Sequence, residues 1–97
     1  MALQKLAGDD PAMRRRRLRY RAWHRGMREM GLILGPFVDA HAEAMPDEEL
    51  QRLERLMAEE DTDLLSWVMG QAEPPAGIDR DMLERLIAFR AANSPPR

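Results

Sequence analysis

Proline, glycine and aspartate divide the chain into short runs of helix-forming residues, and this division constrains the fold more than any other feature. Met, Leu, Ala, Glu and Arg dominate the runs, and β-branched residues rarely follow one another. Residues of this kind lose little freedom in a helix, whereas strands favour β-branched and aromatic residues. No segment alternates apolar and polar residues with the period of a strand. The sequence therefore predicts an all-α fold.

Start signals define the first and third predicted helices. Asp10 before Pro11 can cap free amide groups, while proline at the first helical position gives up no needed donor, so a helix is expected from there to about His24. Pro46 is followed by three acidic residues, which suit the positive end of a helix dipole. This third helix is expected to start at Pro46 and to end near Glu60.

The fourth and fifth helices have equally local signals. Residues 61–63, Asp-Thr-Asp, supply a cap for a short fourth helix that Gly70 closes, because glycine adopts the left-handed terminating conformation without strain. Asp79 is expected to cap the fifth helix, with Ile78 packing on Leu83 as a hydrophobic staple.

The second segment is the least regular. Its apolar residues from Met30 to His41 recur at spacings of three and four, which defines one helical face. Gly31 and Gly35 weaken the helix, and Pro36 removes a backbone hydrogen bond. We expect a kink near Leu32 or a helix restarted close to Pro36.

The chain is long enough for one hydrophobic core and not for two. The predicted organisation is a flexible segment at residues 1–10, a compact five-helix bundle at 11–92 as the single domain, and a disordered tail at 93–97. The longest apolar run, residues 32–38, is far short of the roughly 20 residues that cross a bilayer. With no apolar signal region at the N-terminus, a soluble protein is expected.

Charge is distributed unevenly along the chain. Residues 1–30 carry nine Lys or Arg against three acids, while the remainder carries six Arg against 14 acids. The stretch from Arg14 to Arg28 allows a nucleic-acid-binding interpretation, in which Tyr20 and Trp23 stack on bases. The sequence pI of about 5.7 counts against it. A solvated or protein-docking helix face is the favoured interpretation, in which the arginines stay in water and a narrow apolar stripe packs inward, made of Leu18, Tyr20, Ala22 and Trp23.

Residues for catalysis are scarce. The chain has no Cys and few hydroxyl side chains, so covalent catalysis has little material, and we expect no enzyme activity. The acidic residues at helix starts are explained by the helix dipole. His24 and His41 are too few for a convincing metal site, and no glycine-rich phosphate-binding loop follows a strand. No metal and no cofactor of its own are predicted.

The most informative stretch is Arg25 to Glu29, with the sequence Arg-Gly-Met-Arg-Glu. Gly26 permits a sharp turn between helices and a close approach by a partner's backbone. If the second helix has already begun, Arg25 and Glu29 lie four residues apart on one side and can pair. The alternative is an ordinary helix corner with a surface ion pair worth at most about 1 kcal/mol.

These residues resemble the R-G-x-x-E motif of the FAD assembly factor family, whose members promote covalent flavinylation of the succinate dehydrogenase flavoprotein subunit. The resemblance extends over roughly residues 16–90. It includes Leu18 and Tyr20 in the first helix, the apolar stretch 32–38, the helix start at 47–50, and the segment 63–70, which is similar to the family's D-L-x-x-W pattern.

The resemblance implies a five-helix bundle in which the corner with Arg25, Gly26, Arg28 and Glu29 contacts a partner. That partner would be the flavoprotein subunit of succinate dehydrogenase, with fumarate reductase as a second candidate client. The FAD and the histidine that attacks its 8α-methyl carbon would belong to the client. A monomer in the bacterial cytoplasm is expected rather than a protein of the mitochondrial matrix.

Two further residues are assigned structural support. Asp63 is expected to cap the fourth helix, because a carboxylate at a helix start accepts free backbone N–H groups. Trp67 is expected to fill the core near the corner, since a large aromatic side chain buries much apolar surface.

Overall fold

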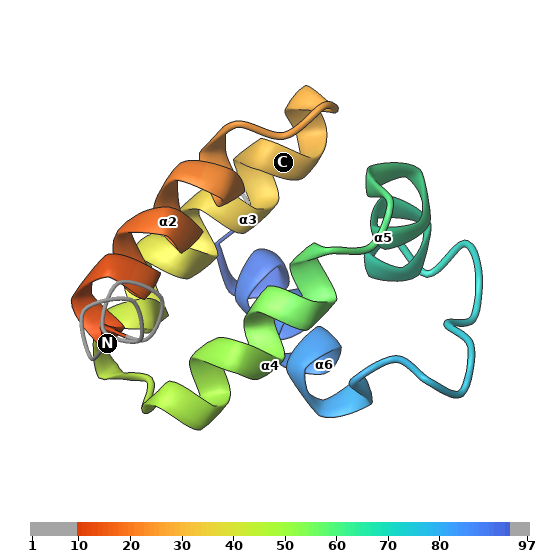
Figure 1. The fold of residues 1–97 in the computed structure, drawn as a ribbon. Helices are drawn as coiled ribbons and strands as arrows, with labels where there is room; N and C mark the ends of the chain where they lie inside the picture. The colour runs from red at the N-terminus through yellow and green to blue at the C-terminus, as the bar shows by residue number, and fades with distance from the viewer. Residues whose placement is uncertain (1–9, 94–97) are drawn as a thin grey trace.

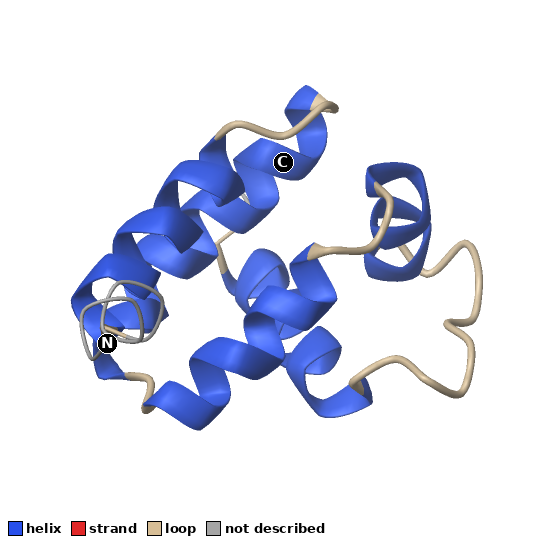
Figure 2. Ribbon diagram, in the orientation of Figure 1, coloured by secondary structure: helices blue, strands red, loops and turns tan. Residues whose placement is uncertain are grey.

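The computed structural model describes residues 10–93, and its secondary structure over this range is helical (Figure 1). Its elements are α2 Pro11–Trp23, α3 Arg28–His41, the 3-10 helix η1 Ala42–Ala44, α4 Asp47–Met57, α5 Asp61–Val68 and α6 Arg80–Ala92. No strand occurs between residues 10 and 93 (Figure 2). The predicted all-α, five-helix fold is confirmed. The predicted flexible segment and tail fall almost wholly on residues 1–9 and 94–97, outside the described range.

The helices pack around one core. α2 and α3 lie side by side, α4 packs on α2 and α6, and α6 also contacts α3 and α5 (Figure 1). The fully buried side chains of largest volume are Phe37, Leu18, Met30, Leu34, Leu50, Leu53, Leu64, Met82, Leu83, Leu86 and Val38. Trp67 is also buried in this cluster, as predicted. Burial of each large apolar side chain contributes roughly 1.5–3 kcal/mol, so the shared core stabilises all five helices.

Two of the predicted helix caps are confirmed. The Asp10 carboxylate accepts a hydrogen bond from Ala12 N at 3.1 Å, and the Asp79 carboxylate accepts one from Met82 N at 3.0 Å. Each bond satisfies a first-turn amide that has no partner inside its own helix. Ile78 packs against the core beside this cap, consistent with the predicted staple.

Gly70 terminates α5 as predicted. It is left-handed, with φ of 75°, and its N–H donates to the Trp67 carbonyl at 3.2 Å. Gln71 N donates to the Ser66 carbonyl at 2.8 Å. This pair of bonds is the Schellman motif, which occupies carbonyls that the ended helix leaves free.

The boundaries of α4 and α5 differ from expectation. Pro46 is the N-cap of α4 and Asp47 its first residue, and α4 ends at Met57 rather than near Glu60 because its last turn tightens into 3-10 bonds. Glu60 is the N-cap of α5 and makes no side-chain capping bond. Asp63 is therefore the third residue of α5 and exposed, so its predicted capping role is wrong.

The second predicted helix is neither ended nor restarted at Pro36. α3 continues through it from Arg28 to His41. A proline inside a helix costs about 3 kcal/mol. The neighbouring Leu34, Phe37 and Val38 are buried, and together they contribute more than this cost.

Two glycines of α3 make the close packing of α2 possible. A methyl group at Gly35 would overlap the indole ring of Trp23, and one at Gly31 would lie 3.2 Å from the Trp23 carbonyl oxygen. The Trp23 Nε1 donates to Asp39 at 3.1 Å, which fixes the ring across α3. The glycines thus weaken the helix locally but let the two helices approach.

The α2 side chains divide differently from the prediction. Leu18 and Ala22 are buried, but Tyr20 and Trp23 are 65% and 43% exposed. Conversely Arg14, expected in water, is buried. The exposed aromatics lie toward the C-terminal end of α2, beside the predicted corner.

Several α2 arginines bind the acidic half of the chain. Arg14 forms an ion pair with Asp47 at 2.7 Å, and Arg19 pairs with Glu43 at 2.9 Å. Arg15 donates to the carbonyls of Ala42 and Met45 at 2.8 and 2.9 Å. Three arginines of α2 are thus occupied within the molecule, which weakens the nucleic-acid interpretation.

Candidate partner-binding site at the corner between α2 and α3

The predicted site lies at the corner that joins α2 to α3. Residues 24–27 connect the helices, and α3 begins only at Arg28. Gly26, Arg28 and Glu29 are exposed. Arg25 precedes the helix, so the conditional pairing of Arg25 with Glu29 across one helical turn does not occur.

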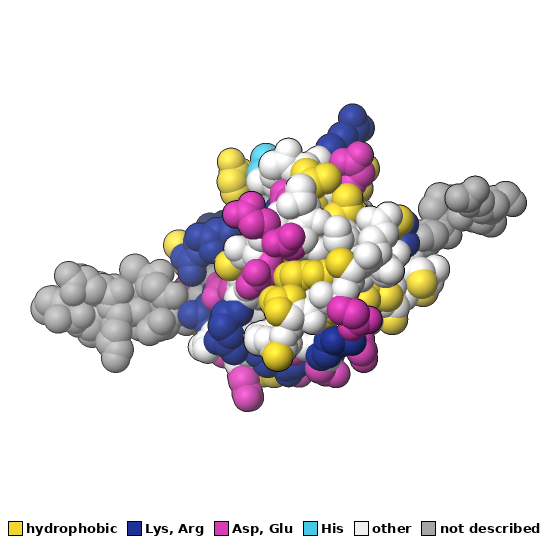
Figure 3. All heavy atoms as spheres, turned by 90° about the vertical axis from the view of Figure 1, so that its right-hand side faces the viewer, with side chains coloured by type: hydrophobic (Ala, Val, Ile, Leu, Met, Phe, Trp, Pro, Cys, Tyr) yellow, Lys and Arg dark blue, Asp and Glu magenta, His cyan; other side chains and the backbone are white. Residues whose placement is uncertain are grey.

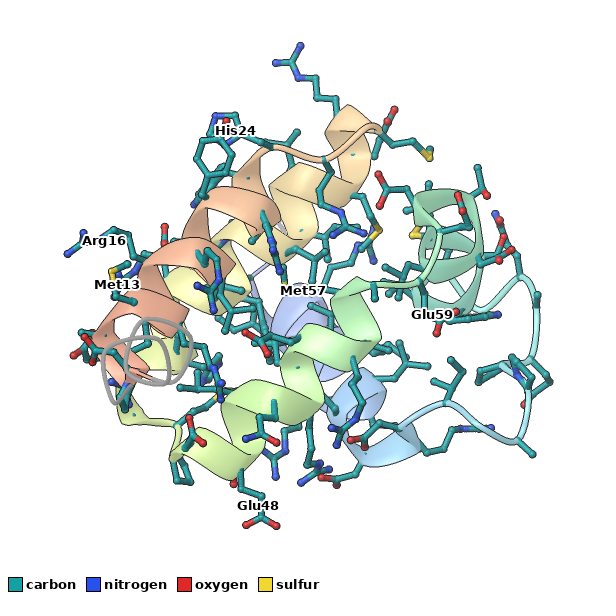
Figure 4. All side chains as sticks on the ribbon, in the orientation of Figure 1. Met13, Arg16, His24, Glu48, Met57 and Glu59 are labelled. Carbon is teal, nitrogen blue, oxygen red and sulfur yellow. The ribbon has the colours of Figure 1, made fainter. Side chains whose placement is uncertain are left out.

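Arg25 turns inward instead. Its guanidinium pairs with Asp61 at 2.6 Å, and it donates to the carbonyls of Met57 at 2.8 Å and Glu59 at 3.3 Å. Met57 is the last residue of α4 and Glu59 follows it in the junction to α5; both are labelled in Figure 4. A cation at this position suits the negative end of the α4 dipole and occupies carbonyls that the ended helix leaves free. The side chain of Arg25 is only 11% exposed.

Asp61 completes this arrangement, and the sequence reasoning missed its role. One carboxylate oxygen accepts from Arg25 Nε at 2.8 Å, and the other accepts from Met27 N at 3.0 Å. As the first residue of α5, Asp61 also lies at the positive end of that helix dipole. Only its acidic character at a helix start was visible in the sequence, since its partners are 34 and 36 residues away.

Gly26 lies on the surface of the corner. The φ angle of Gly26 is outside the left-handed region. Among the glycines that the structure describes, only Gly70 adopts that conformation. A Cβ at Gly26 would lie 3.6 Å from the Asp61 carboxylate, which is ordinary van der Waals contact. The fold therefore does not require glycine here for backbone strain, and the close approach of a partner remains the interpretation for it.

A groove of about 540 Å³ runs beside the corner. Its lining residues come from the end of α2, the corner and the α4 to α5 junction, and include Tyr20, His24, Gly26, Glu60 and Thr62. The Tyr20 and His24 rings stack with centroids 4.0 Å apart on its rim. Figure 3 views the molecule from the α5 side and shows acidic side chains gathered on this face beside exposed apolar ones.

The remaining candidate residues lie elsewhere or have structural contacts. His41 packs against Phe37 and Phe89, with ring centroids 4.8 and 5.2 Å apart. Among the described residues no group of three His, Asp or Glu side chains is arranged to hold a metal ion. No helix within residues 10–93 is long and apolar enough to cross a membrane.

A second Arg and Asp pair joins α4 to the start of α6. Arg52 Nε and Nη2 donate to the two Asp79 oxygens at 2.7 and 2.9 Å. The hydrogen bonds from Arg52, together with that from Met82 N, lower the pKa of Asp79 to about 2 despite partial burial. The same pairing with Asp79 and Asp81 raises the pKa of Arg52.

Comparison with known proteins assigns the family. A family model described as the flavinator of succinate dehydrogenase matches residues 16–90. An FAD assembly factor of Acetobacter pasteurianus is 39% identical over 82 residues, which cover 84% of this chain and 75% of the relative. An FAD assembly factor of Yersinia pseudotuberculosis is 38% identical over 74 residues, covering 76% and 84% of the two chains.

A eukaryotic relative is more distant. The mitochondrial succinate dehydrogenase assembly factor 2 of Dictyostelium discoideum is 28% identical over 81 residues, covering 84% of this chain and 57% of the relative. No solved structure matches the chain significantly. The chain belongs to the family of succinate dehydrogenase flavinators, and the resemblance to FAD assembly factors is confirmed.

Proposed function

We propose that this protein is an assembly factor that binds the flavoprotein subunit of succinate dehydrogenase and promotes covalent attachment of FAD to a client histidine. In this proposal it holds the client in a reactive arrangement, and both the flavin and the nucleophilic histidine belong to the client. The protein itself is not an enzyme and has no cofactor of its own. Fumarate reductase is a second candidate client.

Family membership carries the proposal, and the exposed corner supports the choice of surface. Gly26, Arg28 and Glu29 are exposed beside the groove, where a partner can reach them. No hydrogen bond or ion pair occupies the Arg28 or Glu29 side chain within residues 10–93. Their charges remain free to pair with a client, whereas Arg25 in this proposal mainly holds the corner in place.

The direct test measures covalent flavin on the client. The client flavoprotein subunit is produced with and without this protein, and its covalent flavin is read by in-gel fluorescence after denaturation. We expect a strong signal only when the protein is present. Equal fluorescence in both samples would contradict the proposed function.

Two variants test the surface. Gly26→Val places bulk where the partner approaches, and Glu29→Ala removes an unpaired charge. Each is expected to keep the circular dichroism spectrum while reducing client affinity at least tenfold, the factor that corresponds to about 1.4 kcal/mol. Full activity in both variants would exclude this surface.

Glu48→Ala is the matched control for Glu29→Ala. Glu48 is also an exposed acid in the first turn of a helix, but it lies at the opposite end of the molecule from His24 (Figure 4). The Glu48→Ala variant is expected to support flavinylation normally.

The proposal also includes that the protein is a monomer in the bacterial cytoplasm. The bacterial relatives support the location.

A further inference from the structure

The corner backbone lacks the local bond that usually secures a helix start. Met27 is the N-cap of α3 and makes no side-chain capping bond. In a capping box, a Glu or Gln at the third helical position accepts from the N-cap N–H. Here the third position is Met30, which is buried in the core and has no such acceptor. The Met27 N–H must therefore find its acceptor elsewhere.

Asp61 supplies that acceptor from another helix. Its Oδ2 accepts from Met27 N at 3.0 Å, while its Oδ1 accepts from Arg25 Nε at 2.8 Å. The two bonds bracket Gly26, because they hold the residues on either side of it. The carboxylate is only 14% exposed, so little water competes for it.

Arg25 ties the same carboxylate to the end of α4 through the Met57 and Glu59 carbonyls. The corner is thus bonded to the α4 to α5 junction, and residues of both segments line the groove. We infer that Asp61 is a positioning residue, which fixes the backbone around Gly26 so that Gly26, Arg28 and Glu29 meet the client in one preset arrangement. A loop ordered in advance loses less entropy on binding. This inference rests on the proposed function for its client.

The first test needs no variant. Hydrogen exchange of the wild-type protein is followed residue by residue. The Met27 amide is expected to exchange at least roughly tenfold more slowly than the Arg28 and Glu29 amides, whose positions leave them without a partner inside the helix. Equal exchange at all three amides would overturn the inference.

The second test uses Asp61→Asn, which is nearly isosteric but offers a single acceptor oxygen. With that oxygen on Arg25, the amide group of Asn cannot accept from Met27 N. We expect the exchange rate of the Met27 amide to rise about tenfold, while core amides such as that of Leu53 change little. The concentration of this protein that gives half-maximal flavinylation should also rise about tenfold, and the maximal flavinylation should be retained. Asp63→Asn is the control, because Asp63 lies in the same helical turn and is exposed.

The outcomes separate the two proposals. Unchanged Met27 exchange and unchanged half-maximal concentration in Asp61→Asn would refute the positioning role. Parallel acceleration at Met27 and Leu53 would also refute it, since the carboxylate would then support only global stability. If the wild-type protein gives no flavinylation while Met27 is protected and Asp61→Asn exposes it, the proposed function fails and the structural role of Asp61 stands.

Discussion

Two of the Arg and Asp pairs in this molecule, Arg52 with Asp79 and Arg25 with Asp61, differ in what the aspartate does for the backbone. Asp79 caps its own helix by accepting from Met82 N, three residues onward, and binds Arg52 of α4. Asp61 accepts from Met27 N, 34 residues earlier in the chain, and binds Arg25. The first aspartate secures a helix start locally, whereas the second secures a distant corner.

The difference shows how similar chemistry serves different purposes. The Arg52 and Asp79 side chains are each 26% exposed, more than those of Arg25 and Asp61. Water therefore competes more strongly for the local pair. The distant pair is drier and controls the surface that is proposed to meet the client.

The largest expected effect is that of Arg25→Ala. It leaves the nearly buried Asp61 carboxylate without its cation and frees two carbonyls at the end of α4, so the free energy of unfolding should fall by about 3 kcal/mol. Arg52→Ala should lower the free energy of unfolding clearly less than Arg25→Ala does. Urea unfolding at neutral pH measures both, and an equal or larger loss for Arg52→Ala would reverse the comparison.

A second long-range anchor of the corner is the contact of Trp23 with Gly35. Gly35→Ala forces a methyl group into the indole ring, so the stability should fall by about 1–3 kcal/mol. Gly26→Ala should stay within about 0.5 kcal/mol of wild type, because its Cβ meets only an ordinary contact. Thermal unfolding of the two variants checks this, and a larger loss at Gly26 would mean that the corner is tighter than described.

The local pair should be visible in the acid dependence of stability. The folded-state pKa of Asp79 is about 2 against 3.8 ordinarily, so its contribution is complete above pH 3.8 and is lost as the pH falls toward 2. Asp79→Asn should be less stable at pH 6 and lose less stability between pH 4 and 2. Urea midpoints across this range measure the effect, and parallel curves for the two proteins would count against it.

The smallest effect is expected at Asp63. Its side chain is exposed and the N-cap position is Glu60, so Asp63→Ala should change the free energy of unfolding by less than about 0.5 kcal/mol. A loss near 1 kcal/mol, typical of a removed cap, would restore the capping role that the structure contradicts.

Local signals predicted the parts of the fold that depend on neighbours in the chain. Asp10, Asp79 and Gly70 act as expected, because a cap or a terminating glycine bonds within a few residues. The helix restart expected near Pro36 does not occur, because the burial of Phe37 and Val38 against other helices outweighs the local cost of the proline. The corner was located from the motif, but the inward turn of Arg25 was not predicted.

The sequence by itself determined the helical class and most helix starts, because these follow from backbone preferences and short-range bonds. The motif at Gly26 and Glu29 was identified through its resemblance to the family. Only the tertiary structure decided that Arg25 faces inward, that Asp61 holds Met27, and that Trp23 lies on Gly35. The physical reason is distance along the chain. A carboxylate has the same local signals whether it caps its own helix or binds a corner 34 residues away, and packing selects between them.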